Sequence, residues 1–339
     1  MQKKKERKPL YALLIEHREI PLLAVLVLML ILVSIRVPGY IPSSYMNILK
    51  NGSIQMVLSC GMLCVLLVGS IDISTTAILA FSACVMGKLM GEGIITSVFA
   101  MFALGTLIGA VIGLINGLLM SYGRVVAIIV TLSTSYIVRA LIPMDWLMGM
   151  NKINPTDLTN EFAFFLTGNS FLGLPLLVWM AIGVTVLTGV FLKYTRTGRN
   201  LYAVGSNAEA AEMRGVPSNR IRVLAHVICG ATCGLAGIMW LSYYNAVEKS
   251  TATGIEMFTI AACVLGGVSV TGGYGKISGV IIGVIMIALI DNAIPMLKLK
   301  NTMITEFIKG ILLLFAILLN VILQRMANKQ DLVRRSNLR

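Results

Sequence analysis

The chain has 339 residues, of which 57% are hydrophobic and 13% are charged, with a net charge of +13 and a mean hydropathy of +0.86. A soluble domain ordinarily carries about 25% charged residues, so the composition excludes a soluble globular protein. A membrane crossing takes about 20 mostly apolar residues in a helix, and open sheets cannot satisfy their backbone groups in lipid. We therefore expect an all-α fold, a polytopic membrane helical bundle.

Ten apolar segments follow one another along the chain, with eight crossings as the alternative if the shorter segments are interrupted or re-entrant. The expected helices cover residues 20–37, 47–69, 73–90, 94–120, 124–142, 170–193, 221–243, 257–272, 277–297 and 303–324. The first of them closes with Arg36 and Pro38 and has no small-residue cleavage site, so we expect it to remain as a signal anchor. The chain is thus divided into a basic N-terminal segment at 1–19, a transmembrane domain at 20–324 and a basic tail at 325–339.

The distribution of Lys and Arg tests this arrangement, because cytoplasmic segments carry the excess of these residues. With ten crossings and the N-terminus inside, 19 of the 28 Lys and Arg residues fall on the cytoplasmic side. Both termini and the segment from Lys193 to Arg222 are therefore expected in the cytoplasm. The net positive charge then faces anionic membrane lipid, and we expect no nucleic-acid partner.

Glycine and cysteine are typical of helix packing here. Gly105, Gly109, Gly113 and Gly117 recur every four residues, which predicts a close approach between two helices. Six cysteines lie within apolar segments, and the only histidine among those segments is His226, so the cysteines are interpreted as small hydrophobic residues. We expect no metal site and no cofactor.

Two glycine-rich stretches interrupt the apolar runs, at 68–74 and at 266–275. Irregular backbone at membrane depth is tolerated only where protein or a water-filled cavity surrounds it, so these stretches indicate a translocation path. The second stretch does not fit the phosphate-binding motif, because Val270 stands where that motif needs glycine. The chain has no other such motif, and it is not expected to be an enzyme.

Ionisable residues at membrane depth are functional candidates. Asp72 has an alternative role as a helix cap, and Glu306 stands three residues before Lys309, with which it is expected to pair. Asp291 lies next to Asn292. Asn116, one position from the glycine ridge, is a candidate either for the path or for a hydrogen bond between helices.

Five segments, in order along the chain, are similar to those of a known family. They are GSIDIS at 69–74, GLINGLLMSYGR at 113–124, GNSFLGLP at 168–175, GRNLYAVGSNAEAAEMRGV at 198–216 and GGVSVTGGYGKISGVIIG at 266–283. The chain resembles the permease subunits of bacterial ABC importers for ribose, xylose and galactose, a group that includes autoinducer-2 permeases. The resemblance implies a multi-pass protein of the bacterial inner membrane that forms the path for a monosaccharide or a related small polyol.

The same resemblance implies partners: an ABC ATPase subunit, a periplasmic or lipid-anchored sugar-binding protein and a second permease copy or paralogue, with membrane lipid around them. The translocation path is expected at Asp72, Ser74, Asn116, Thr131, Ser133, Asp291 and Asn292. The ATPase is expected to bind a coupling loop at 194–220, through Arg199, Gly205, Asn207, Glu209, Ala210, Ala211, Arg214 and Gly215. A short helix with small side chains in that loop suits a cleft in a partner.

Departures from the family pattern leave the substrate open. Val125 and Val126 replace two prolines of the family, and Asp291 replaces an asparagine. The alternatives are a proton-coupled secondary transporter, or an ABC permease for autoinducer-2, nucleosides or branched-chain amino acids.

Overall fold

The protein is mostly helical in the part that the computed structural model describes, which is residues 19–36, 39–142, 152–153, 158–168 and 170–296, with single positions at 307, 310, 311, 314 and 318. The helices are α2 (Glu19–Arg36), α3 (Tyr40–Leu67), α4 (Thr75–Gly91), α5 (Val98–Ser121), α6 (Ala127–Leu141), α7 (Asn160–Gly168), α8 (Leu176–Tyr194), α9 (Arg196–Ser206), α10 (Ala208–Met213), α11 (Ser218–Tyr244), α12 (Ile255–Leu265) and α13 (Ile277–Met296). Two antiparallel pairs complete it: β1 (Lys152–Ile153) with β4 (Val247–Glu248), and β2 (Ser170–Phe171) with β3 (Leu174–Pro175). The expected helical bundle is confirmed.

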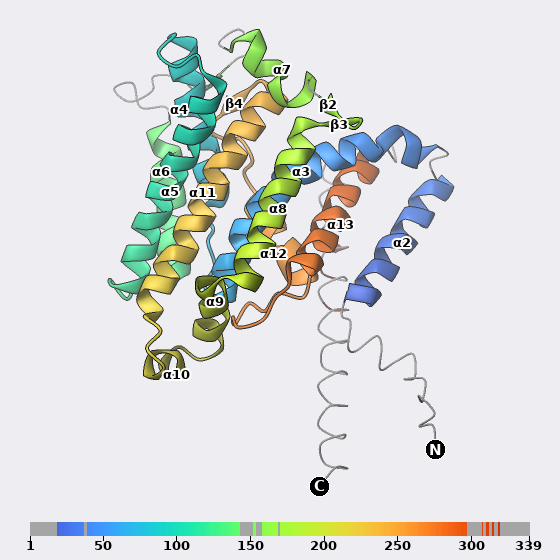
Figure 1. Ribbon diagram of the computed structural model, residues 1–339. Helices are drawn as coiled ribbons and strands as arrows, with labels where there is room; N and C mark the ends of the chain where they lie inside the picture. Colours follow the sequence, from blue (N-terminus) through green and yellow to red (C-terminus); the bar gives the residue numbers. More distant parts are fainter. Residues whose placement is uncertain are drawn as a thin grey trace, which may run out of the picture.

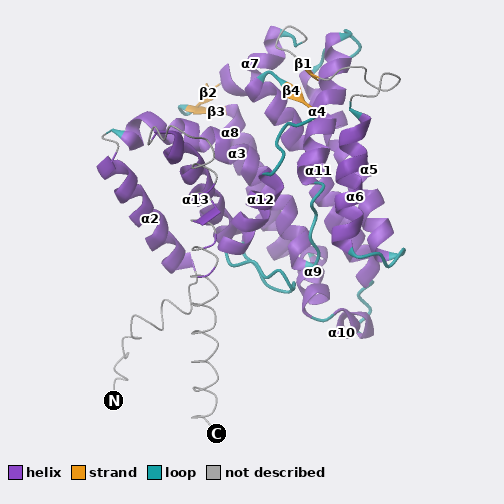
Figure 2. Ribbon diagram, turned by 180° about the vertical axis from the view of Figure 1, so that it is seen from behind, coloured by secondary structure: helices purple, strands orange, loops and turns teal. Residues whose placement is uncertain are grey.

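Long helices run between two ends of the bundle (Figures 1 and 2). One end carries α9 and α10, and the other carries α7 and the β1–β4 pair; we name them the α9/α10 end and the α7/β4 end. Four helices of the described part are long and apolar enough to cross a membrane: Ser44–Leu67 within α3, then α5, α8 and α11. The bundle also contains shorter apolar helices, among them α4 and α12.

The first nine predicted spans each overlap one helix. Three details differ from the prediction. Helix α12 ends at Leu265 rather than near 272, because Gly267 adopts a positive φ of 82° that turns the chain. The coupling loop holds two helices, α9 and α10, where one was expected, and α7 was not predicted. The tenth span, 303–324, and the expected Glu306 to Lys309 pair lie outside the described residues.

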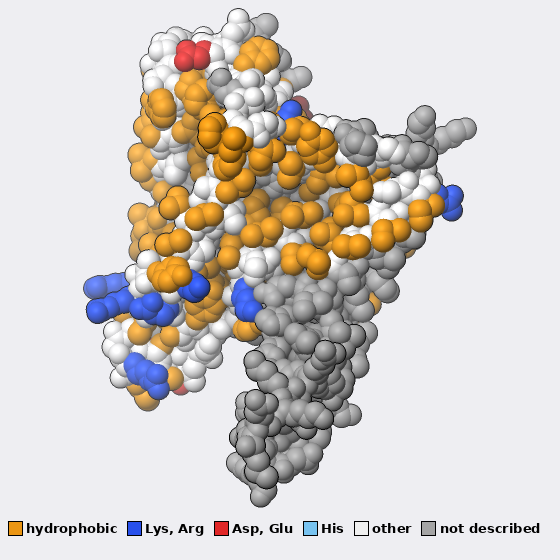
Figure 3. Space-filling model, turned by 45° about the vertical axis from the view of Figure 1, so that its right-hand side comes forward, with side chains coloured by type: hydrophobic (Ala, Val, Ile, Leu, Met, Phe, Trp, Pro, Cys, Tyr) orange, Lys and Arg blue, Asp and Glu red, His pale blue; other side chains and the backbone are white. Residues whose placement is uncertain are grey.

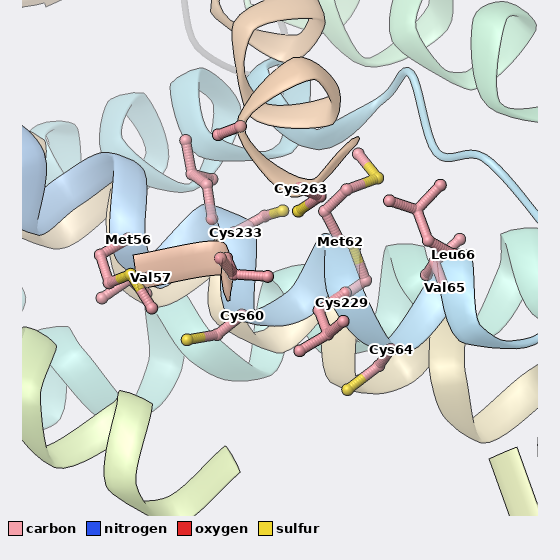
Figure 4. Packing of buried hydrophobic residues seen from close by; sticks show 14 of the residues in the cluster. Met56, Val57, Cys60, Met62, Cys64, Val65, Leu66, Cys229, Cys233 and Cys263 are labelled. Atoms are coloured by element: carbon pink, nitrogen blue, oxygen red, sulfur yellow. The ribbon is translucent and has the colours of Figure 1, made fainter. Parts of the chain in front are cut away.

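The core centres on α3, which is surrounded by α8, α11, α12 and α13. Its side chains meet those of the neighbouring helices in one apolar cluster, in which Cys60 and Cys64 of α3 lie near Cys229 of α11 and Cys263 of α12 (Figure 4). All six cysteines are buried and free, as expected of small hydrophobic residues. Hydrophobic side chains cover much of the outer surface, and Lys and Arg gather toward the α9/α10 end (Figure 3). This division fits a protein whose middle faces lipid.

The glycine ridge of α5 packs directly on α11. A side chain at Gly109 would collide with the backbone of Gly230, and one at Gly113 with the carbonyl group of His226. The reverse also holds, since a side chain at Gly230 would strike the Gly109 carbonyl. The predicted close approach is therefore confirmed, and it brings the polar residues of α5 within reach of α11.

We expect Gly109→Val to lower the free energy of unfolding by about 1–3 kcal/mol, since the new side chain must displace a helix backbone. The matched control is Gly183→Val, because Gly183 lies on α8 with open space where its side chain would stand. Thermal melting of the two variants in detergent measures the difference. Equal melting temperatures would show that α5 and α11 do not pack through this glycine.

Candidate translocation and docking sites

The stretch at 68–74 leaves the end of α3 and places its polar groups inside the bundle. Gly69 adopts a φ of 73°, which turns the chain away from the helix axis. The carboxylate of Asp72 is fully buried and accepts hydrogen bonds from the backbone N–H (2.9 Å) and the hydroxyl (2.6 Å) of Ser74, the residue that precedes α4. One oxygen of Asp72 thus holds Ser74. Ser74, and not Asp72, is the N-cap residue of α4, and no side chain forms a cap hydrogen bond there, so the capping alternative for Asp72 is wrong.

The other carboxylate oxygen of Asp72 meets His226 of α11. The distance from Asp72 Oδ2 to His226 Nδ1 is 3.3 Å, and both side chains are fully buried. The second ring nitrogen, Nε2, lies 3.0 Å from the Ser70 hydroxyl. Since an unpaired buried carboxylate is costly, His226 is the partner that makes Asp72 tolerable at this position. No functional role was predicted for His226 from the sequence.

Asn116 and two threonines extend this network to α5 and α6. The Asn116 side chain donates to the Ser74 hydroxyl (3.0 Å) and accepts from Thr134 (2.6 Å). Thr131 accepts a hydrogen bond from the backbone of Ile73 at 3.2 Å. We name the whole group the buried polar cluster; its members are Ser70, Asp72, Ser74, Asn116, Thr131, Thr134 and His226.

A cavity of about 620 Å³ reaches the buried polar cluster from the α9/α10 end. Ser70 lies on its wall and joins it to His226. The remaining wall carries charged and polar groups of α10, α11 and the α5–α6 loop, among them Arg124, Glu212, Asn219 and Arg222. Polar lining of this kind suits a water-filled approach to the interior.

The other predicted path residues lie elsewhere. Ser133 is exposed on α6, where its neighbour Thr134 turns into the cluster instead. Asp291 and Asn292 are half-buried on α13, which packs against α2, α3, α8 and α12. The cluster belongs to α5, α6, α11 and the stretch before α4, on the opposite side of the bundle (Figure 1). The structure therefore groups Asp72, Ser74, Asn116 and Thr131, and separates Ser133, Asp291 and Asn292 from them.

Helices α9 and α10 are each started by a polar cap. Thr195 accepts from the backbone of Gly198, and Asn207 accepts from the backbone of Ala210, both at 2.9 Å. Ala211 is buried, which fixes α10 against the rest of the protein. The predicted docking residues Arg199, Asn207, Glu209, Ala210, Arg214 and Gly215 are exposed, and Gly205 is half-buried. Met213, which sequence reasoning missed, is 91% exposed at the end of α10.

Helix α9 contacts the end of α3 and the glycine-rich stretch at 266–275. The backbone of Gly205 lies against the carbonyl group of Leu67 and the nitrogen of Gly273, and Gly273 itself donates to Leu67 at 2.9 Å. The Tyr202 hydroxyl donates to the Gly275 carbonyl at 3.0 Å. Burial raises the pKa of this phenol above its ordinary value, so Tyr202 keeps its proton and remains a donor.

The stretch at 266–275 lies between two helices and not within one. It joins the ends of α12 and α13 beside α9, at the α9/α10 end (Figure 2). It does meet the first stretch there, because Gly272 packs on Gly69. Only the stretch at 68–74 enters the bundle.

Comparison with known proteins places this arrangement in context. The profile of one family, described as branched-chain amino acid transport system / permease component, matches residues 44–317. An L-arabinose ABC transporter permease protein of Azospirillum brasilense is 35% identical, over 84% of this chain and 82% of its own. A ribose import permease protein of Escherichia coli K12 is 31% identical, over 88% and 92%, and an autoinducer 2 import system permease protein of Escherichia coli is 31% identical, over 88% and 85%. No solved structure matches the chain.

Proposed function

This chain belongs to the family described as branched-chain amino acid transport system / permease component, and from this premise we propose that it forms the membrane path of an ATP-driven importer for a monosaccharide or a related small polyol. The family describes a transport component, so ATP hydrolysis belongs to a partner chain and not to this one. The names of the relatives, for arabinose, ribose and autoinducer 2, favour a sugar or a similar polyol over an amino acid. They also favour an ATP-driven importer over a proton-coupled transporter.

Membership of this family also indicates where the chain lies in the cell and which proteins it binds. It is a multi-pass protein of the inner membrane, and its partners are an ATPase subunit and a substrate-binding protein. We further propose that both termini lie in the cytoplasm, because Arg199, Arg214 and Arg220 mark the α9/α10 end as the cytoplasmic one. Membrane lipid would surround the apolar outer face, and a second permease copy or a paralogue would complete the path.

We propose that α9 and α10 dock the ATPase. We also retain the proposed division of the chain into a basic N-terminal segment at 1–19, a transmembrane domain at 20–324 and a basic tail at 325–339. The observation that supports docking is the exposed side chain of Met213, which has the charged residues Glu209 and Arg214 beside it on the chain. Met213 lies at the end of the bundle where the polar cavity opens. An apolar anchor inside a charged rim is the usual composition of a docking surface. Motion of α9 would reach the end of α3 and the stretch at 266–275 through Gly205.

Uptake by reconstituted vesicles tests the importer. We expect uptake of an aldopentose to require ATP, the ATPase and the binding protein, and to persist when an uncoupler collapses the proton gradient. Asp291→Asn should keep this uptake, because the amide has the same volume and can still accept a hydrogen bond. Uptake by this chain alone that both the uncoupler and Asp291→Asn abolish would overturn the proposal in favour of a secondary transporter.

A further inference from the structure

A second break in the bundle lies between α11 and α12. After Asn245 the chain pairs briefly as β4 and then continues without helix to Gly254, where α12 starts. The strand packs against α4 near the α7/β4 end, and α12 runs toward the α9/α10 end (Figure 2). Helix α4 shows the opposite course, because it starts inside the bundle and runs to the α7/β4 end (Figure 1). Two helices, of 17 and 11 residues, thus begin within the protein and run in opposite directions.

The first turns of these two helices contact each other through charged and polar groups. The Thr76 hydroxyl of α4 donates to Glu256 Oε2 of α12 at 2.6 Å, and the backbone N–H of Gly254 donates to the same oxygen at 3.0 Å. Arg139 of α6 donates from Nη2 to the Thr76 hydroxyl at 3.1 Å. We name Thr76, Arg139 and Glu256 the Arg139 bridge.

The second guanidinium nitrogen of Arg139 holds the broken segment. Nη1 donates to the carbonyl groups of Lys249 (2.6 Å) and Thr251 (3.2 Å). Arg139 therefore joins α6, α4 and the segment before α12 at one point. None of the three bridge residues was predicted from the sequence, because Glu256 lies between two predicted spans and its partners lie on other helices.

The bridge lies at membrane depth. Thr76 is 15 residues from the end of α4 and Glu256 is nine residues from the end of α12, so at 1.5 Å per residue the bridge is about 22 Å from one end and about 14 Å from the other. These distances add to about the thickness of a bilayer. A charged pair at this depth must face water or protein, since exposure to hydrocarbon is costly.

The bridge is also open on one side. Arg139 and Glu256 are only partly buried, and Met257 next to Glu256 is 51% exposed. Both hydrogen bonds that the carboxylate accepts within the described part of the chain fall on Oε2, which leaves Oε1 to accept from a ligand. The guanidinium can still donate from Nε and from the second hydrogen of Nη2.

We propose that Thr76, Arg139 and Glu256 form a subsite that binds the hydroxyl groups of the sugar on its way through the membrane; this rests on the proposed function. A carboxylate acceptor and a guanidinium donor that share the Thr76 hydroxyl match two neighbouring hydroxyls, one of which donates while the other accepts. An amino-acid carboxylate fits less well, because the nearby carboxylate of Glu256 would repel it. Glu256 disfavours an anionic substrate.

Cysteine accessibility in the assembled complex tests the position of the subsite. In a background whose six native cysteines are replaced by alanine, Met257→Cys should react with a small hydrophilic thiol reagent. Leu107→Cys is the matched control, because Leu107 is 57% exposed on the apolar face of α5 and should stay unreactive. A transported aldopentose, added with the binding protein and ATP, should slow labelling at 257 about tenfold. Equal inertness at both positions, or labelling that the sugar does not slow, would overturn the proposal.

Variants of the bridge test its role in transport. Glu256→Gln and Thr76→Val should lower aldopentose uptake at least tenfold in complexes that assemble normally and keep their basal ATP hydrolysis. Glu92→Gln, an exposed acid at the end of α4, is the control and should leave uptake unchanged. Unchanged uptake in both bridge variants would overturn the subsite while leaving the importer standing. Wild-type complexes that carry leucine but no aldopentose would instead overturn the proposed function, and the subsite with it.

Discussion

His226→Leu should lower the free energy of unfolding by about 3–5 kcal/mol, because it leaves the carboxylate of Asp72 buried without its partner. This is the largest stability effect that we expect from a single polar residue of this protein. The same change also leaves the Ser70 hydroxyl without the imidazole nitrogen that lies 3.0 Å away. Thermal melting of the purified chain in detergent, together with its yield in the membrane, measures the loss.

A double-mutant cycle separates this explanation from simple loss of packing. If the charge left behind is the cause, Asp72→Leu combined with His226→Leu should cost less than His226→Leu alone. Thr134→Val is the control within the same cluster, since it removes one neutral hydrogen bond to Asn116 and should cost only about 1 kcal/mol. A double variant less stable than both single variants would contradict a paired, charged Asp72.

Gly205→Val should uncouple transport from ATP hydrolysis while the ATPase remains bound. The backbone of Gly205 lies against Leu67 and Gly273, so the valine side chain must push α9 away from the end of α3 and from the stretch at 266–275. The exposed face of α9 and α10 is untouched by this change. We expect uptake to fall at least tenfold and the co-purified ATPase to stay at its normal ratio, as measured by uptake and by quantitative gel analysis.

We expect the opposite result for Met213→Glu, which should release the ATPase. Met213 is 91% exposed at the end of α10 and contributes little to the fold, so its replacement should leave the chain stable but release the ATPase. The two variants thus separate docking from transmission. If Gly205→Val released the ATPase and Met213→Glu retained it, the roles that we assign to α9 and α10 would be wrong.

The sequence by itself determined the class of fold and most of the helices. Nine apolar segments were located because hydropathy along the chain marks the residues that avoid water, although only four helices of the described part are long enough to cross a membrane. The glycine ridge of α5 was predicted correctly for a similar reason, since residues four apart lie on one face of a helix. Polar residues in apolar segments need hydrogen-bond partners. This rule identified Asp72, Ser74 and Asn116 before their partners were known.

Only the tertiary structure decided which residues those partners are. Asp72 and His226 are 154 positions apart, and Thr76 and Glu256 are 180 apart, so no local pattern connects them. The sequence pointed to Ser133, whereas its neighbour Thr134 faces the cluster, and the cause is similar. Successive residues of a helix point about 100° apart, and the packing of the neighbouring helices decides which of them faces inward. In the sequence, the polar segment before α12 resembles an ordinary loop for the same reason. The carbonyl groups of Lys249 and Thr251 accept hydrogen bonds from Arg139, a residue of α6 that lies beside them only in the folded chain.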